Sequence, residues 1–333
     1  MPRKLKLARR ARTAAGFAVF LVKRLLGAAA VLVLVGIFTF GLIRWLRPEQ
    51  YHDPLIAGTR HDLGRAFLHF DFGPGCSANP ACFPVRLYWE RGWRADLIVL
   101  FGGIAVGVVI GIALGLWCAR HRRSLRARSI EAAAMFFYCA PSFVLAYGLL
   151  LLFNSTFGAF PVPYLFDALP QNYDSTAHPL VWLSAYWLPV TLVGLPIAGA
   201  IIRLLPSGVR EEMDADYIRT AIAKGLTQRR VVRRHAAPGV FPQVTALVWA
   251  LVPITVTNAV LIESTLSVPG FFLRIKAASG HTPPPVSSHP PPPIDIPMLQ
   301  GAALWIAALI LVLTLLTDLA LLIIDPRVRA SGA

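Results

Sequence analysis

Long apolar runs without a charged residue dominate this 333-residue chain. Six such runs, each of 19 to 35 residues, alternate with segments rich in arginine, glycine and proline. They cover residues 25–43, 97–119, 132–166, 179–202, 236–262 and 296–317. Because a helix needs about 20 apolar residues to cross the hydrocarbon core of a bilayer, every run is long enough to span it. We therefore predict an all-α integral membrane protein with six transmembrane helices.

The third and fourth runs contain residues that interrupt or bend helices. Run 132–166 is too long for one span and contains Asn154, Gly158 and two prolines near its end. We expect one helix over about 131–153 and a loop beyond it. Run 179–202 carries Pro189 and Pro196, and prolines inside a span kink the helix where neighbours satisfy the freed carbonyl groups. The kinks either shape a translocation path or belong to a bent packing helix.

The second run contains four glycines at a strict four-residue spacing, Gly103, Gly107, Gly111 and Gly115. On a helix they form one smooth stripe, and such a stripe lets another helix approach closely in lipid. We predict a helix-packing face there.

Composition and charge fix the class and the orientation. Hydrophobic residues make up 56% of the chain and charged residues only 15%, while the formal net charge is +15. The basic residues stand between the apolar runs, 23 on one side of the predicted membrane and 8 on the other. By the positive-inside rule, both termini face the cytoplasm. The charge thus reports topology and predicts the lipid bilayer, not nucleic acid, as partner.

The predicted spans divide the chain into successive membrane, outer and cytoplasmic segments. We expect a basic cytoplasmic N-terminus over 1–24, a first span over 25–46 and a large extracytoplasmic loop over 47–95. The first span ends in Arg44, Trp45 and Arg47 rather than in a small-residue cleavage site, so we interpret it as uncleaved. A core region that contains the other five spans follows, with its outer and cytoplasmic segments. The core covers residues 96–324. It includes a basic cytoplasmic loop over 203–237 and a proline-rich outer loop over 276–295, and a cytoplasmic tail follows over 325–333.

Cys76 and Cys82 lie in the first outer loop, within a proline- and glycine-rich turn. On the oxidising side of the membrane a local disulfide forms readily, but two free thiols remain the alternative. The proline-rich loop favours an extended polyproline conformation and is either a spacer or a receptor contact.

The basic loop contains the signals of a helix-turn-helix. Asp216 can cap a short helix over 217–224, Gly225 can end it in the left-handed conformation, and Thr227 can cap a second helix. We expect this motif to lie at the membrane surface.

The segment DYIRTAIAKGLTQRRVVRRH (216–235) resembles the cytoplasmic EAA loop of ABC-importer permeases, in its dipeptide/oligopeptide-type form. The pattern EAA-x-x-x-G corresponds to Arg219, Thr220, Ala221 and Gly225. In that family the loop docks on the ATPase subunit, so the resemblance implies a coupling site. Its residues are Asp216, Tyr217, Arg219, Thr220, Ala221, Ala223, Lys224 and Gly225. The small side chains at 220, 221 and 223 would allow close approach of the partner. The alternative is a solvated amphipathic loop that faces anionic lipid.

Two further segments carry the same resemblance. ESTLSVPGFFLRI (263–275) resembles the E-T-x-F-S-x-P-G-x-G-x-L segment after the fifth span, at Glu263, Ser267, Pro269 and Gly270, with Leu266 and Phe272 departing from the pattern. The end of the chain, from Asp318 to Arg327, resembles the terminal D-x-x-x-x-x-x-D-P-R. We expect a structural salt-bridge or capping role for Asp318.

The resemblance implies the membrane subunit of a heteromeric importer in a bacterial cytoplasmic (inner) membrane. In such an importer, ATP-driven closure of the ATPases moves the docked loop as a rigid lever. Its partners would be a second homologous permease, two ABC ATPases and an extracytoplasmic binding protein. The subunit would form half of the translocation pathway for di- or oligopeptides, and relatives of this architecture that import nickel, opines or glutathione leave those substrates open.

The sequence lacks the residue patterns that ATP binding, metal binding or catalysis would need. No lysine follows a glycine, so a P-loop for ATP is excluded, and no metal-ligand spacing or paired carboxylate pattern stands out. We therefore expect no catalytic residue, no metal and no cofactor, with ATP bound by the partner subunits. The alternatives from another class are a stand-alone ion-coupled carrier, which needs charged residues buried in the spans where we find none, and a membrane enzyme or sensor.

Overall fold

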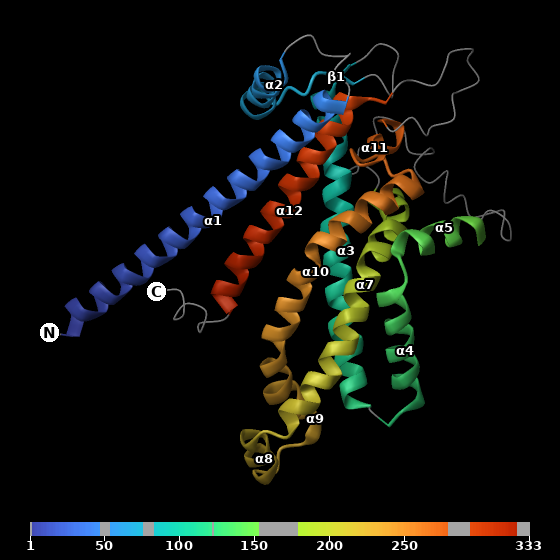
Figure 1. The fold of residues 1–333 in the computed structure, drawn as a ribbon. Coiled ribbons are helices and arrows are strands. Elements are labelled where there is room, and N and C mark those ends of the chain that lie inside the picture. Colours follow the sequence, from blue (N-terminus) through green and yellow to red (C-terminus); the bar gives the residue numbers. More distant parts are fainter. Residues whose placement is uncertain are drawn as a thin grey trace. The chain divides into compact units, whose positions relative to one another are not determined.

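The computed structural model describes residues 2–46, 54–75, 83–121, 123–152, 179–278 and 294–324, most of them in helices (Figure 1). The chain forms two compact units, Met1–Arg86 with Asp295–Ala333 and Leu87–Ile294. Cys76 and Cys82, most of the proline-rich loop and the tail 325–333 lie outside the described residues.

The first unit is built on two long helices. Its elements are α1 (Pro2–Leu46), α2 (Leu55–His69), the short antiparallel strands β1 (Pro74–Gly75) and β2 (Phe83–Pro84), and α12 (Ile296–Ile324). α1 packs against α2 and α12, around a small core that includes Phe40, Ala66 and Leu304. Arg24 of α1 forms an ion pair with Asp318 of α12, so the structural role expected for Asp318 is confirmed.

The second unit is a helical bundle that holds the predicted core region 96–324 only as far as Ile294, because α12 belongs to the first unit. Its elements are α3 (Val85–Arg120, whose first two residues belong to the first unit), α4 (Leu125–Cys139), α5 (Ser142–Leu152), α7 (Pro179–Met213), α8 (Asp216–Ala223), α9 (Gln228–Val231), the π-helical turn η3 (Val232–Ala236), α10 (Ala237–Leu266) and α11 (Leu273–Ala278). α7 packs against α4 and α10. Its buried residues Ile197, Ile201 and Leu205 share a core with Val240 and Val244 of α10.

By length and composition, five described helices or helix runs could cross a membrane, and a sixth span results if the bent pair of α4 and α5 counts as one. This pair corrects the predicted single helix over 131–153, because α4 ends at Cys139 and α5 begins at Ser142 after a bend of 102°. The cause is Pro141. Its ring disfavours helical geometry at the residue before it, and Ala140 is extended, with φ −72° and ψ 129°.

Several helices continue beyond the charge-free runs. α3 already begins at Val85, inside the segment predicted as an outer loop, and α7 runs on to Met213, inside the predicted cytoplasmic loop. α2 occupies another part of the predicted outer loop. Charged residues limit the part of a helix that can lie in the hydrocarbon core, but they do not interrupt its backbone hydrogen bonds. The length of a charge-free run is therefore shorter than the helix that contains it.

Candidate functional site

The helix α8 lies at one end of the second unit, beyond the ends of α7 and α10 (Figure 1). Its inner face is fixed in the protein core, because Ile218 is fully buried and Ala221 is 7% exposed. Both belong to the core cluster that contains Val209 of α7 and Val240 of α10. α8 is therefore attached firmly to the two long helices that it connects.

The outer face of α8 consists of exposed side chains from the predicted coupling set. They are Asp216, Tyr217, Arg219, Thr220, Ala223 and Lys224, with Gly225 following. Ile222 adds an exposed apolar side chain. We predicted that the small side chain of Ala221 allows a partner to approach. It lies on the inner face instead, so its small size serves packing against the core of this chain.

The boundaries of α8 partly follow the prediction. Gly225 has φ +79°, and the amide of Leu226 donates to the carbonyl of Ala221, which is the left-handed helix end expected from the glycine. The N-terminal prediction was wrong by one residue, since Ala215 occupies the N-cap position without a side-chain cap. Asp216 is the first helical residue, where its negative charge still favours the helix dipole.

A residue that the sequence analysis missed stabilises the start of α8. The hydroxyl of Tyr217 donates a hydrogen bond to Glu212 of α7, and this bond to a carboxylate raises the pKa of Tyr217 to about 12. The Glu212 carboxylate also lies over Gly239 of α10, where an added Cβ would come within 3.0 Å of its Oε atoms. Glu212 thus contacts α8 and α10 from the end of α7. In the sequence, only its position shortly before the segment 216–235 could have indicated this.

The second helix of the predicted helix-turn-helix is short and continuous with the next span. The carbonyl of Thr227 accepts hydrogen bonds from the amides of Arg230 and Val231, so Thr227 stands at the start of α9, as predicted. α9 passes directly through η3 into α10. The loop therefore returns to the membrane as one rod rather than as a separate helix.

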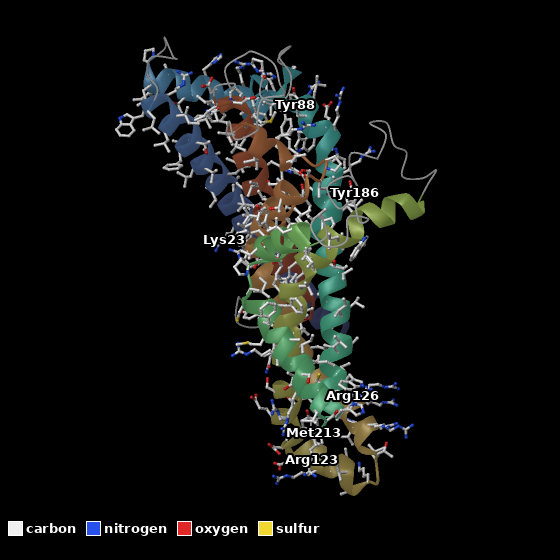
Figure 2. All side chains as sticks on the ribbon, turned by 90° about the vertical axis from the view of Figure 1, so that its right-hand side faces the viewer. Lys23, Tyr88, Arg123, Arg126, Tyr186 and Met213 are labelled. Carbon is white, nitrogen blue, oxygen red and sulfur yellow. The ribbon has the colours of Figure 1, made fainter. Side chains whose placement is uncertain are left out.

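Basic side chains gather at the α8 end of the second unit. Arg123 and Arg126 lie at the same end as Met213, whereas Tyr88 and Tyr186 lie toward the other end (Figure 2). Arg219, Lys224, Arg229 and Arg230 are exposed around α8. This end of the unit therefore presents a cationic surface.

The glycine stripe of α3 lies against α7. A Cβ on Gly107 would come 2.5 Å from the carbonyl oxygen of Gly194, and one on Gly103 would meet Val193. Gly111 and Gly115 face Ile201 and Leu205 in the same way. The stripe is thus used within this chain, at a backbone-to-backbone approach that larger residues would prevent.

The motif after α10 forms a tight turn over two buried carboxyl groups. Ser267 ends α10 in the left-handed conformation, with φ 55°, and Gly270 is buried while Pro269 is exposed. Glu263 and Asp96 of α3 are both 0% exposed. Our expectation that no charged residue is buried in the spans, and that no carboxylates are paired, was therefore wrong. The chain separates the two residues widely, so no local spacing revealed the pair.

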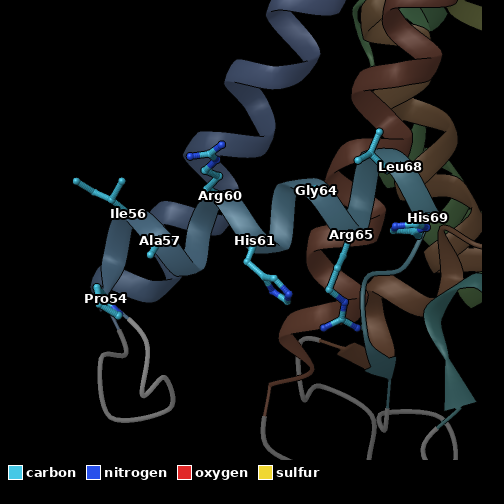
Figure 3. A pocket seen from close by; sticks show the side chains of 9 residues that line it. All are labelled: Pro54, Ile56, Ala57, Arg60, His61, Gly64, Arg65, Leu68 and His69. Carbon is cyan, nitrogen blue, oxygen red and sulfur yellow. The ribbon is translucent and has the colours of Figure 1, made fainter.

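Among the described residues, no three His, Cys, Asp or Glu side chains are grouped as metal ligands. A shallow hollow follows α2 in the first unit, with Arg60, His61, Arg65 and His69 beside Ile56 and Leu68 (Figure 3). Asp71 forms an ion pair with Arg65. The hydrogen bond from the Arg65 guanidinium lowers the pKa of the Asp71 carboxyl.

Comparison with known proteins gives a consistent result along most of the chain. A peptide transport system permease of Brucella abortus (strain 2308), so named, is 28% identical over 337 residues, which cover 93% of this chain and 98% of the relative. The dipeptide transport system permease protein DppB of Bacillus subtilis (strain 168) is 24% identical over 93% of this chain and 97% of its own length.

Residues 111–330, about two thirds of the chain, match a family described as the binding-protein-dependent transport system inner membrane component. That range contains α8, the turn after α10 and most of the helical bundle. Together with the apolar helices, the match identifies a multi-pass membrane protein that is a transporter subunit and not itself an enzyme. The chain belongs to the family of inner membrane components of binding-protein-dependent transport systems.

Proposed function

We propose that this chain forms half of the translocation pathway of an ATP-driven importer of peptides, and that α8 is the docking element for an ATPase subunit. The main observation that supports this proposal is that α8 has a buried face and an exposed face. Ile218 anchors the helix in the core shared by α7 and α10, while Tyr217, Arg219 and Ala223 are exposed. A force applied to the outer face is thereby transmitted to two spans as a rigid-body motion.

Membership of this family supports a transporter of several subunits. The proposed partners are a second homologous permease, two ABC ATPases that bind the ATP, and an extracytoplasmic binding protein. This chain itself needs no cofactor in that arrangement. The arginines near α8 support a cytoplasmic position for this end by the positive-inside rule, and the proposal puts both termini on the same side. Peptide as substrate rests on the names of the relatives, and nickel, opines and glutathione are the competing substrates.

The test is co-purification of the tagged full-length chain from its native membrane in mild detergent. Ala223→Trp places a large side chain on the outer face of α8 without touching the core. Arg126→Trp is the matched control, because Arg126 is exposed on α4 at the same end of the unit (Figure 2). We expect Ala223→Trp to lose the co-purifying ATPases and their ATP hydrolysis, and Arg126→Trp to retain both.

Equal recovery of ATPases with both variants would contradict α8 as the docking element. A chain that is folded in the membrane and never recovers an ATPase would contradict the importer itself. Uptake of a labelled dipeptide into vesicles with the co-purified binding protein, compared with nickel and glutathione, then decides the substrate class.

A further inference from the structure

A buried pair of carboxyl groups lies at the end of the second unit opposite α8. Asp96 of α3 and Glu263 of α10 are completely buried, and their carboxyl groups lie side by side. Both point to the same place, because a Cβ added to Gly270 would overlap Oδ1 of Asp96 and Oε2 of Glu263. Burial of two acidic groups is costly unless hydrogen bonds compensate it.

Asp96 anchors the turn that follows α10. Its Oδ1 atom accepts hydrogen bonds from the amide of Phe271 at 2.7 Å and from the amide of Phe272 at 3.4 Å. Both phenylalanine side chains and that of Val268 are buried. One helical turn before Asp96, Gly92 lies directly under the amide of Phe271, where any Cβ would overlap it. The turn is thus held flat on the backbone of α3.

Two carboxyl groups this close form a hydrogen bond only when one of them carries a proton. Ionised carboxylates only accept hydrogen bonds, and within the described residues neither oxygen of Glu263 has an N–H or O–H donor. Asp96 already accepts two amide hydrogen bonds, which favour its ionised form. The proton therefore belongs to Glu263, which donates it toward Asp96.

Other titratable groups surround the pair. Tyr186 of α7 is buried close enough for the charges of both Asp96 and Glu263 to affect it. Of the two basic residues of α11, Arg274 and Lys276, Arg274 lies over the ring of Tyr88 at 5.5 Å from its centroid, with Arg91 of α3 nearby.

We propose that Asp96 and Glu263 share one proton and act together as positioning residues, a carboxyl latch that holds the turn 267–272 against α3 and releases it when the proton is removed. Without the proton, two negative charges would face each other away from water, which is strongly unfavourable. The proposal concerns the turn itself and does not depend on the substrate or on the ATPase contact.

Two adjacent positions of the turn report its opening. Val268 is fully buried, whereas Ser267 is exposed. In the full-length chain with its four cysteines replaced by alanine, we introduce either Val268→Cys or Ser267→Cys and measure labelling by a water-soluble thiol reagent in permeabilised native membranes. The ratio of the two rates cancels the intrinsic pH dependence of thiol reactivity. Labelling at 268 follows the population of the open turn.

The first comparison tests the anchor. Asp96→Asn keeps an oxygen that accepts from the amides and adds an NH₂ group that donates to Glu263, so the labelling ratio should remain low. Asp96→Leu has a similar size but no acceptor, and we expect its ratio to rise about tenfold or more, because buried amides left without a partner favour the open state. An unchanged ratio in Asp96→Leu would overturn the anchor.

The second comparison tests the proton and uses a conservative variant that keeps the fold. Between about pH 6 and about pH 9.5 we expect the ratio of the parent to rise, because removal of the shared proton leaves two negative charges facing each other. Glu263→Gln carries a permanent donor, so its ratio should remain low and independent of pH. A flat profile in the parent, or the same rise in Glu263→Gln, would overturn the shared proton.

Discussion

Gly107 of α3 and Gly194 of α7 are in backbone contact: a Cβ on Gly107 would lie 2.5 Å from the carbonyl oxygen of Gly194. The reciprocal Cβ on Gly194 would lie 3.0 Å from the amide nitrogen of Gly107. Neither helix can yield locally, because the atoms that would be met belong to the backbone. The two residues therefore set the distance between α3 and α7.

Gly107→Ala should destabilise the protein by about 1–3 kcal/mol, the usual cost of overpacking, and lower its melting temperature in detergent. Gly148→Ala is the control, because nothing lies within 4 Å of a Cβ at Gly148 in α5. That variant should be neutral or slightly stabilised, since alanine is the better helix former. Equal melting temperatures of the two variants would contradict the close approach.

Gly225 should tolerate asparagine but not valine. A Cβ at Gly225 would meet no atom within 4 Å, so the cost arises from its φ of +79° alone. Asparagine adopts the left-handed conformation at little cost, whereas a non-glycine residue there commonly costs about 1–2 kcal/mol and a β-branched one more. We expect Gly225→Val to reach the membrane but to uncouple ATP hydrolysis from transport. Coupled transport in this variant would show that the helix end does not matter.

Tyr217 should ionise at an unusually high pH. Its folded pKa, about 12, lies above the ordinary value of 10.0 because Glu212 accepts its proton in a hydrogen bond. The stabilisation is therefore complete below about pH 10 and is lost as the pH rises toward 12. Ultraviolet titration of the wild type minus Tyr217→Phe should show this tyrosinate, and Glu212→Gln should shift it back toward 10. An unshifted titration in Glu212→Gln would contradict the bond.

Pro141→Ala should straighten the bend between α4 and α5. Alanine supplies an amide and removes the ring that keeps Ala140 extended. Spin labels at residues 129 and 151 should then move apart, toward the roughly 33 Å expected for a continuous helix of that length. Pro189→Ala, inside the unbroken α7, should leave the distance unchanged. No increase in Pro141→Ala would mean that packing alone holds the bend.

Removing Asp62 should destabilise the first unit more than removing both members of its ion pair. Arg44 is 6% exposed and donates from Nη2 to Asp62 at 2.8 Å. Asp62→Leu leaves a buried cation, at a typical cost of about 3–5 kcal/mol. In Arg44→Met/Asp62→Leu the cost should be smaller, as a thermal melt can measure. A double variant as unstable as the single one would exclude the buried charge as the cause.

The sequence alone was sufficient for the features that depend on local pattern. The charge-free runs located the long helices, Gly225 marked the end of α8, and the spacing of four glycines indicated a packing face on α3. Each of these depends on residues within a few turns of one another, where composition and backbone preference decide the outcome. Pro141 was an equally local signal, but it was overlooked inside an apolar run.

Only the tertiary structure decided which polar groups meet. The pairings of Asp96 with Glu263, of Asp96 with an amide 175 residues away, and of Arg24 with Asp318 join segments far apart in the chain. Nothing in the sequence near Asp96 distinguishes a charge at the edge of a span from one buried under a turn. The free energy that decides between these states is the loss of hydration on burial, and the groups that compensate it come from other helices.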